Sequence, residues 1–351
     1  MKKAIALTSL LALTACSTTT QPEAIETSSN ESQEVIQVSS SIVPISSLVA
    51  SIGGEYIDVQ NIVPVGVSPH GFDLSAQQMA RLSESEAVFM IGLDHIDGFL
   101  EPAVSDDKQV HLADGMELIE TEGHDHHDHH GHHDDHSEEH ADEHEDEHEE
   151  EHHDEHGHED DHHDEHEEHD EHEEEGHTDD HSVDPHVWMG QENVAIISEK
   201  IVARLSEILP EQAETFETNA QELLADIDAE YDRFAQATTG KNPTNFIVFH
   251  DAYNYLFASI DLDPQYKKPF SENVLHDTSA THLAKLAEAV EHDSISTIYS
   301  EPQFETGNVE TFAQEHGLTI GILDPHGTST QAGGYVKNLA SNLDSLISIY
   351  E

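Results

Sequence analysis

Apolar and polar residues follow two alternating patterns along the chain, one typical of strands and the other of helices. Short apolar runs are followed by segments such as 76–85 and 282–291, in which apolar residues recur at helical spacing. The strand candidates are residues 35–43, 59–63, 87–91, 110–112, 246–249, 297–299 and 318–323. Strands that alternate with helices predict parallel sheets covered on both faces, and hence the α/β fold class.

A long helix is predicted between two such α/β regions. Apolar residues over 211–238 recur at spacings of three, four and seven positions, and Gly240 and Pro243 end the pattern. At 1.5 Å per residue such a helix is roughly 40 Å long, which is more than one lobe needs. We therefore expect an N-terminal α/β lobe over 35–210, a linking helix over 211–238 and a C-terminal α/β lobe over 239–351.

The first residues have the anatomy of an export signal. Lysines precede an apolar stretch at 4–12 that is too short to span a bilayer. The segment LTAC at 13–16 resembles the lipobox of bacterial lipoproteins, in which the cysteine is lipidated and becomes the mature N-terminus. We therefore expect a signal peptide at 1–15, a lipid anchor on Cys16 and a flexible tether at 16–34. An ordinary signal peptide with an incidental cysteine is the alternative.

The composition changes abruptly in the middle of the chain. Residues 124–181 hold 22 of the 32 His and 30 of the 75 acidic residues, without any Lys or Arg. With almost nothing apolar to bury, this tract cannot offset its ordering entropy, so we expect a disordered insertion over 120–182. Closely spaced His chelate metal transiently, which favours a role in concentrating metal over that of a solvated polar linker. The candidate auxiliary ligands are His126, His127, His129, His130, His132, His133, His152, His153, His162 and His163.

The formal net charge of −63 restricts the partners of this chain. Without residues 124–181, the remaining chain still has 12 basic and 45 acidic residues, which leaves a net charge of −33. Such a surface repels phosphate backbones, and no basic patch in the sequence offsets it. The composition therefore excludes nucleic-acid binding.

Four candidate metal ligands stand near the ends of predicted elements. His70 lies in a turn-rich segment after an apolar run, and His250 and Asp324 each follow a strand candidate directly. His186 lies where the acidic tract returns to ordinary sequence. Open parallel sheets bind ligands at the carboxyl ends of their strands, and three imidazoles with one carboxylate suit Zn²⁺. A His in a hydrogen-bonded loop and an Asp that caps a turn are the structural alternatives.

Five segments resemble the successive hallmarks of bacterial ABC-transporter metal-binding proteins. They are residues 52–93, DPHVWMGQENV at 184–194, FIVFHDAYNYLF at 246–257, IYSEPQF at 298–304 and GILDPHG at 321–327. The resemblance implies two parallel-sheet α/β lobes that are joined by one long rigid helix, with a metal site in the interlobe cleft. It implies His70 and His186 as ligands from the first lobe. The implied ligands from the second lobe are His250 and Asp324.

His250 at the third ligand position is typical of the zinc-uptake, ZnuA-like subgroup, whereas manganese-selective members commonly have Glu there. Imidazole itself also favours Zn²⁺ over Mn²⁺. The resemblance thus implies a monomeric, lipid-anchored receptor, in the periplasm or on the outer face of the cell membrane, that delivers Zn²⁺ to an ABC permease and its ATPase. The alternatives are a receptor for manganese or another divalent metal, and a metal-storage or adhesion lipoprotein without a transport role. We expect no enzyme, because no convincing general base lies beside an open metal position.

The sequence also departs from the pattern of this family. Pro69 stands where many zinc-uptake relatives have an acidic residue, and a single cysteine cannot form the second-lobe disulfide of some members. His326 stands in the DPHG motif where many relatives have an apolar residue, and we expect it at the surface. Because the long helix opposes a large hinge motion, we expect the lobes to close only slightly.

Overall fold

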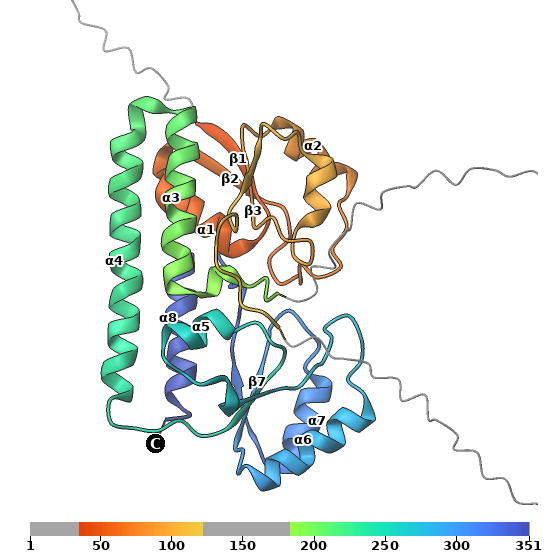
Figure 1. The fold of residues 1–351 in the computed structure, drawn as a ribbon. Helices are drawn as coiled ribbons and strands as arrows, with labels where there is room; N and C mark the ends of the chain where they lie inside the picture. The colour runs from red at the N-terminus through yellow and green to blue at the C-terminus, as the bar shows by residue number, and fades with distance from the viewer. Residues whose placement is uncertain (1–34, 122–182, 351) are drawn as a thin grey trace, which may run out of the picture. The chain divides into compact units, whose positions relative to one another are not determined.

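Two four-stranded sheets form the framework of residues 35–121 and 183–350, the part of the chain that the computed structural model describes (Figure 1). The first sheet has the order β2-β1-β3-β4, with β1 (Ile36–Ser40), β2 (Ile57–Asn61), β3 (Val88–Met90) and β4 (Gln109–His111). The second has the order β6-β5-β7-β8, with β5 (Phe246–Val248), β6 (Lys267–Pro269), β7 (Thr297–Ser300) and β8 (Thr319–Ile322). Neighbouring strands in both sheets are parallel, so the predicted fold class is confirmed.

Helices connect these strands and cover the sheets. The α-helices of the described segments are α1 (Val43–Gly53), α2 (Ala76–Glu84), α3 (Gln191–Ile208), α4 (Ala213–Thr238), α5 (Asn254–Ser259), α6 (Ala280–His292), α7 (Gly307–His316) and α8 (Gly334–Ile347). The 3₁₀ turns are η1 (Gly54–Tyr56), η2 (Gly98–Ala103), η3 (Val187–Met189), η4 (Pro210–Gln212) and η5 (Pro264–Tyr266). Serine side chains set two of the starts: Ser75 caps α2 in a capping box with Gln78, and Ser279 caps α6.

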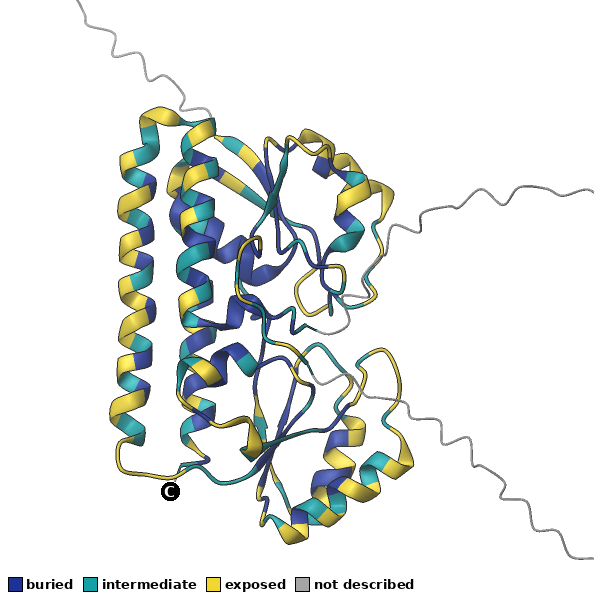
Figure 2. Cartoon of the chain, viewed as in Figure 1, coloured by how far each residue is buried: buried dark blue, intermediate teal, exposed yellow. Residues whose placement is uncertain are grey.

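The long helix α4 links the two lobes. It has 26 residues and follows the 3₁₀ turn η4, so it begins two residues later than we expected. It packs along α1 and α3, which belong to the first lobe, and along α8, which belongs to the second. Figure 2 shows the buried positions of α4 on the side that faces α3 and α8. These buried residues are Phe216, Ala220, Leu223, Ile227, Tyr231 and Phe234.

One continuous apolar core extends through both lobes. It contains Leu48 of α1, Ile197 of α3, Ile227 of α4 and Leu343 of α8, all at most 1% exposed. Apolar burial is the main favourable term in folding, so a core that both lobes share opposes their separation. Two smaller clusters lie beside the individual sheets, one between the first sheet and α2 and one between the second sheet and α6 and α7.

Two predicted boundaries differ from the structure for local reasons. The strand expected at 35–43 ends at Ser40, because α1 begins at Val43 with Pro44 in its first turn, where proline is favoured. The edge strand β6 was not predicted, because its sequence Lys-Lys-Pro carries no apolar signal.

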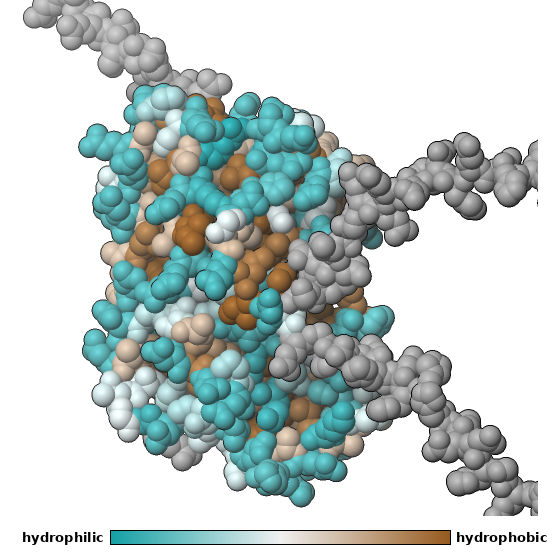
Figure 3. Space-filling view, viewed as in Figure 1, coloured by the Kyte–Doolittle hydropathy of each residue, from teal (hydrophilic) through white to brown (hydrophobic). Residues whose placement is uncertain are grey.

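Most of the face drawn in Figure 3 is hydrophilic, as the acidic composition predicts. None of the helices in residues 35–121 and 183–350 has both the length and the apolar character that crossing a bilayer requires.

Candidate metal centre

Three imidazoles that are far apart in the sequence meet at one place. Nε2 of His186 lies 3.3 Å from Nε2 of His70 and 3.3 Å from Nε2 of His250. One ligand atom from each of the three residues lies within 4.8 Å of the others. A tetrahedral zinc ion with Zn–N bonds of about 2.0–2.1 Å separates its ligand nitrogens by about 3.3–3.4 Å. Two of the three nitrogen pairs therefore already have the spacing of a zinc site.

The ends of parallel strands bring two of these imidazoles together. His70 lies in the turn that follows β2, where the Phe72 backbone N–H donates to the Pro69 carbonyl at 3.1 Å. His250 lies two residues beyond the end of β5. His186 comes from neither strand and directly precedes η3 at the start of the segment that leads into α3. His70 and His250 therefore lie beyond the carboxyl ends of strands, which is where the sequence predicted them.

A buried carboxylate orients His186. Its Nδ1 lies 2.8 Å from Oδ1 of Asp184, which is fully buried and also accepts from the His186 backbone N–H. Burial raises the pKa of Asp184, but hydrogen bonds from His186 and Asn254 outweigh it and hold this pKa below its ordinary value. An ionised Asp184 that accepts from Nδ1 leaves the Nε2 lone pair of His186 free to bind metal.

A second buried carboxylate holds His250 in the same way. Nδ1 of His250 lies 2.7 Å from Oε1 of Glu301, which is 1% exposed and directly follows β7. This contact directs Nε2 of His250 toward His186. Each lobe thus supplies one imidazole that a carboxylate orients, which is the usual arrangement around metal-binding histidines.

Burial keeps the imidazole of His70 neutral. Burial, followed by repulsion from His186 and His250, lowers the pKa of His70 to about 2, although a hydrogen bond with the His95 backbone opposes this. Only a neutral imidazole has a lone pair for a metal. The candidate ligand His70 therefore has a free lone pair across the physiological pH range.

The structure does not bring Asp324 into the group of three imidazoles. Its Oδ1 accepts from Nε2 of Gln303 at 2.8 Å, from the His326 backbone N–H at 3.0 Å and from the Gly327 backbone N–H at 2.8 Å. Its backbone N–H donates to Asn342. Asp324 therefore stabilises the turn after β8, and its role as a fourth ligand stays a prediction.

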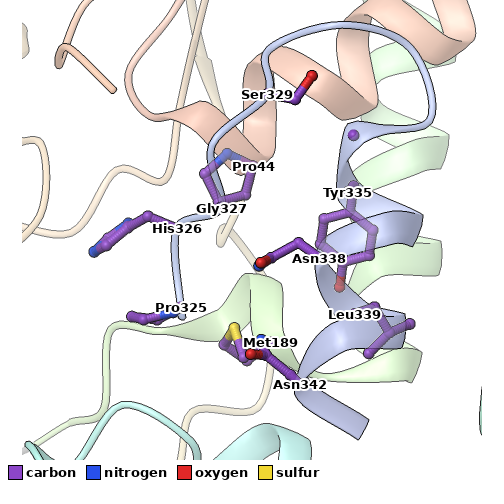
Figure 4. Close-up of a pocket in the computed structure, with 11 residues that line it drawn as sticks. Pro44, Met189, Pro325, His326, Gly327, Ser329, Tyr335, Asn338, Leu339 and Asn342 are labelled. Atoms are coloured by element: carbon purple, nitrogen blue, oxygen red, sulfur yellow. The ribbon is translucent and has the colours of Figure 1, made fainter. Parts of the chain in front are cut away.

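The expected surface position of His326 is wrong. The residue is 5% exposed, and its ring centroid lies 5.7 Å from that of Trp188. The turn held by Asp324 directs the ring inward, away from Tyr335 and Asn338 of α8 (Figure 4). Burial, followed by repulsion from the three clustered imidazoles, holds the pKa of His326 well below its ordinary value. The local sequence does not predict this burial, because it depends on packing of the His326 turn against the distant residue Trp188.

Two cavities reach the imidazole cluster from outside. One of about 420 Å³ is lined by His70 and His186 from the first lobe and by Asn273, Val274 and Leu275 from the second. The other, of about 710 Å³, is lined by His250, Asp251, Glu120 and Thr121 among others. Thr121, the last described residue before the acidic tract, therefore lines a cavity that reaches a candidate ligand.

Three functional side chains were missed by the sequence analysis. Asp184 and Glu301 orient two imidazoles, and Gln303 holds the Asp324 carboxylate. All three residues belong to segments that resemble family hallmarks, Asp184 to DPH and Glu301 and Gln303 to EPQ. Their place in these hallmark segments was the only indication of a role that the sequence offered. Their roles could not be assigned because each acts on a residue whose position depends on the fold.

Some expected sites lie outside the described residues. Cys16 belongs to the N-terminal segment, and the auxiliary ligands belong to the acidic tract; they are His126, His127, His129, His130, His132, His133, His152, His153, His162 and His163. The two edges of the tract are paired with each other, through an antiparallel bridge between Glu120 and Val183 and a 2.8 Å bond from the Asp184 N–H to the Ile119 carbonyl. The insertion therefore leaves and re-enters the fold at one point.

Comparison with known proteins gives consistent results. The family model described as "Zinc-uptake complex component A periplasmic" (ZnuA) matches residues 38–349. The high-affinity zinc uptake system protein ZnuA of Haemophilus influenzae is 35% identical over 316 residues, which is 88% of this chain and 91% of that protein. The zinc-binding protein AdcA of Streptococcus pyogenes serotype M3 is 26% identical over 83% of this chain and 50% of that protein.

The fold of this chain is similar to that of solved structures. A crystal structure of ZnuA superposes with a TM-score of 0.66 at 22% identity, covering 90% of this chain and 99% of that one. A zinc-bound ZnuA mutant that lacks residues 138–173 of its own chain also has a TM-score of 0.66 at 22% identity, covering 90% and 98%. By the match of the family model to nearly all described residues, this chain belongs to the ZnuA family of periplasmic zinc-uptake components.

Proposed function

We propose that this chain is an extracytoplasmic receptor that captures Zn²⁺ with high affinity and delivers it to an ABC permease and its ATPase for import. The observation that carries the proposal is the cluster of His70, His186 and His250, with two of its Nε2–Nε2 distances at 3.3 Å. Membership in the zinc-uptake family supports the same conclusion.

The donor set favours zinc over manganese. Three imidazoles provide nitrogen ligands, which suit Zn²⁺, whereas Mn²⁺ is better matched by carboxylate and water oxygens. The buried carboxylates of Asp184 and Glu301 lie behind two of these imidazoles, and such carboxylate partners make imidazoles stronger ligands. As ligands we propose His70, His186 and His250, together with Asp324 from the turn after β8 as the fourth.

The protein acts as a binding protein rather than an enzyme in this proposal. Its three protein nitrogens and a fourth ligand from the second lobe close a four-coordinate site, whereas catalytic zinc sites keep an open position. The acidic tract concentrates or buffers Zn²⁺ before transfer to the closed site. A lipid on Cys16 holds the protein at the membrane, on the periplasmic or outer face, as a monomer.

Release of the metal requires only small movements. Hydrogen bonds join the lobes beside the site: Nε1 of Trp188 donates to the Pro325 carbonyl at 2.7 Å, and the Tyr335 hydroxyl donates to the Trp188 carbonyl at 2.7 Å. The Tyr255 hydroxyl donates to the Asp184 carbonyl at 3.0 Å. These bonds, with the shared core, oppose a wide hinge opening, so the ligand-bearing turns move instead.

The test is a competitive zinc titration of the full chain, with metal analysis, for wild type and for His70→Ala, His186→Ala and His250→Ala. We expect one tight site in wild type and losses in the variants that exceed the about 10- to 100-fold typical of outer-shell changes. His292→Ala is the matched control, because the His292 side chain is 89% exposed and pairs with its neighbour Asp293, away from the cluster. Retention of tight zinc binding after any of the three cluster substitutions would refute the proposed site.

Transport needs a separate measurement. In cells that lack their own zinc receptor, the wild-type gene should restore zinc uptake through the cognate permease, and His250→Ala should not. If the purified protein binds zinc but never supports uptake, the storage or adhesion alternative is correct and the receptor role is wrong.

A further inference from the structure

The ammonium of Lys267 is a buried positive charge close to a proposed cation site. Its side chain is 8% exposed, in a chain with only 12 Lys and Arg against 75 Asp and Glu. Among the described residues that line the two cavities reaching the imidazole cluster, Lys267 is the only Lys or Arg. A positive charge repels Zn²⁺, so the charge by itself opposes the proposed function. The contacts of Lys267 point to a different role.

Lys267 is bonded to two side chains of the segment that follows His250. It begins the edge strand β6, and its Nζ donates to the carboxylate of Asp251 and to Oδ1 of Asn254. The same Nζ lies 5.9 Å from the centroid of the Phe257 ring. The Asp251 carboxylate offsets the charge of the ammonium. The bond to Asn254 connects Lys267 to the groups that support the metal site.

Lys267 determines which way the Asn254 amide is oriented. An amide side chain has an accepting oxygen and a donating nitrogen, whereas an ammonium only donates and an ionised carboxylate only accepts. The Asn254 oxygen therefore faces Lys267, and Nδ2 donates to Oδ2 of Asp184 at 3.0 Å. Exchanging the two ends would place N–H against the ammonium and oxygen against the carboxylate. The amide thus has one stable orientation, in which its donor reaches Asp184.

This chain of hydrogen bonds ends at a candidate ligand. Oδ1 of Asp184 lies 2.8 Å from Nδ1 of His186 and accepts from the His186 backbone N–H at 2.9 Å. A carboxylate held on both oxygens keeps the ring proton on Nδ1 and the lone pair on Nε2, where metal binds. In such a network the orientation of each member restricts the next, so the effect of Lys267 extends beyond its direct contacts.

We propose that Lys267 is a positioning residue of the zinc site, which acts through Asn254 and Asp184 to hold His186 in its metal-binding tautomer. This inference rests on the proposed zinc-receptor function. It links β6 of the second lobe to a candidate ligand of the first lobe without any contact between Lys267 and the ion.

The direction of the effect distinguishes this role from a purely electrostatic one. If Lys267 acted through its charge alone, a neutral residue in its place would strengthen zinc binding, because a repulsion would be removed. If Lys267 acts through the chain of hydrogen bonds, the same replacement weakens zinc binding.

The test is a competitive zinc titration of the full chain with Lys267→Met, which removes the ammonium and keeps an unbranched apolar side chain. We expect zinc affinity to fall by about 5-fold or more, within the range of coupling between members of one hydrogen-bond network. Lys268→Met is the matched control, because Lys268 is the next residue of β6, is 37% exposed and pairs with Asp293 at 3.6 Å. It should bind zinc as wild type does. Urea unfolding of each metal-free variant checks the fold.

Two further measurements test the path. In an Asp184→Asn background, Lys267→Met should have little additional effect on zinc affinity, because the two residues act in one chain. Long-range ¹H–¹⁵N NMR spectra of the histidine rings in the metal-free full chain report the tautomer, with His186→Gln to assign the signals of His186. We expect the proton on Nδ1 in wild type and partly on Nε2 in Lys267→Met. A merely structural role would lower stability and leave this signature unchanged.

Asn254→Leu removes the amide itself, so it tests the chain even if Lys267→Met does not fold, and it should weaken zinc binding at least as much. Three results would each overturn the proposal: zinc binding by folded Lys267→Met that equals or exceeds that of wild type, an undiminished effect of Lys267→Met in the Asp184→Asn background, or wild-type affinity in Asn254→Leu. Failure of wild type itself to bind zinc tightly would instead refute the proposed function.

Discussion

The Nδ1 atom of His186 lies 2.8 Å from Oδ1 of Asp184, a carboxylate with no exposed surface. Oδ2 of Asp184 accepts from Asn254 at 3.0 Å, so a residue of α5 in the second lobe supports a candidate ligand of the first. This relationship fixes the imidazole tautomer, with the proton on Nδ1 and the lone pair on Nε2. We therefore expect metal affinity to depend on Asp184, although Asp184 is not one of the proposed ligands.

Asp184→Asn should weaken zinc binding by about 10- to 100-fold, the range typical for loss of such a supporting group. The amide can donate to Nδ1, which moves the ring proton to Nε2 and blocks the metal lone pair. A chelator-competition titration measures the change. Glu207→Gln is the matched control, because Glu207 pairs with Arg204 on the exposed surface of α3. Equal affinities for Asp184→Asn and wild type would contradict the role of Asp184.

Removing residues 124–181 should abolish several weaker zinc sites and preserve one tight site per chain. The edges of the excised segment are already joined by the Glu120–Val183 bridge, so the remaining link closes a short turn. Equilibrium dialysis with metal analysis counts both classes of site. Loss of the tight site in a folded deletion variant would show that the tract supplies ligands to it.

The metal-free protein should lose stability as the pH falls below the ordinary His value. The pKa of His70 is lowered to about 2 in the folded state, by burial first and then by His186 and His250. Its unfolded value is about 6.5. Because the unfolded chain binds a proton over this window that the folded chain does not, the free energy of unfolding decreases by at most about 1.4 kcal/mol per pH unit below 6.5.

Urea unfolding of metal-free wild type and His70→Asn at about pH 7.5 and about pH 5 tests this linkage. The difference between the two pH values should be smaller in the variant, because asparagine does not titrate. An equal loss of stability in both proteins would assign the pH dependence to other groups.

Zinc binding should also weaken on acidification, because protonated imidazole in the tract does not bind metal.

Trp188→Phe should destabilise the junction between the lobes. It removes the 2.7 Å hydrogen bond from Nε1 to the buried carbonyl of Pro325 and leaves that carbonyl without this donor. A loss of about 1–3 kcal/mol in the free energy of unfolding is expected. Urea unfolding measures it, and Tyr266→Phe, outside this network, is the control. A stability equal to wild type would mean that this bond contributes nothing to the junction.

The sequence by itself determined the fold class, the long linking helix and the three histidines that meet in the cluster. Short apolar runs and helical periodicity indicate which residues are buried, because the spacing of apolar residues within a strand or helix determines which of its faces is buried. His70 and His250 could be placed because the ends of parallel strands are a predictable location for ligands.

Only the tertiary structure decided which groups act on those histidines. The sequence could not identify Asp184 and Glu301 as the hydrogen-bond partners of His186 and His250. In sequence, a carboxylate that orients a histidine does not differ from any other acidic residue. His326 was misplaced because its direction depends on the turn that Asp324 holds and on contact with Trp188, 138 positions earlier in the chain. Burial of a polar side chain is a property of packing among distant segments, and local residue pattern carries no record of it.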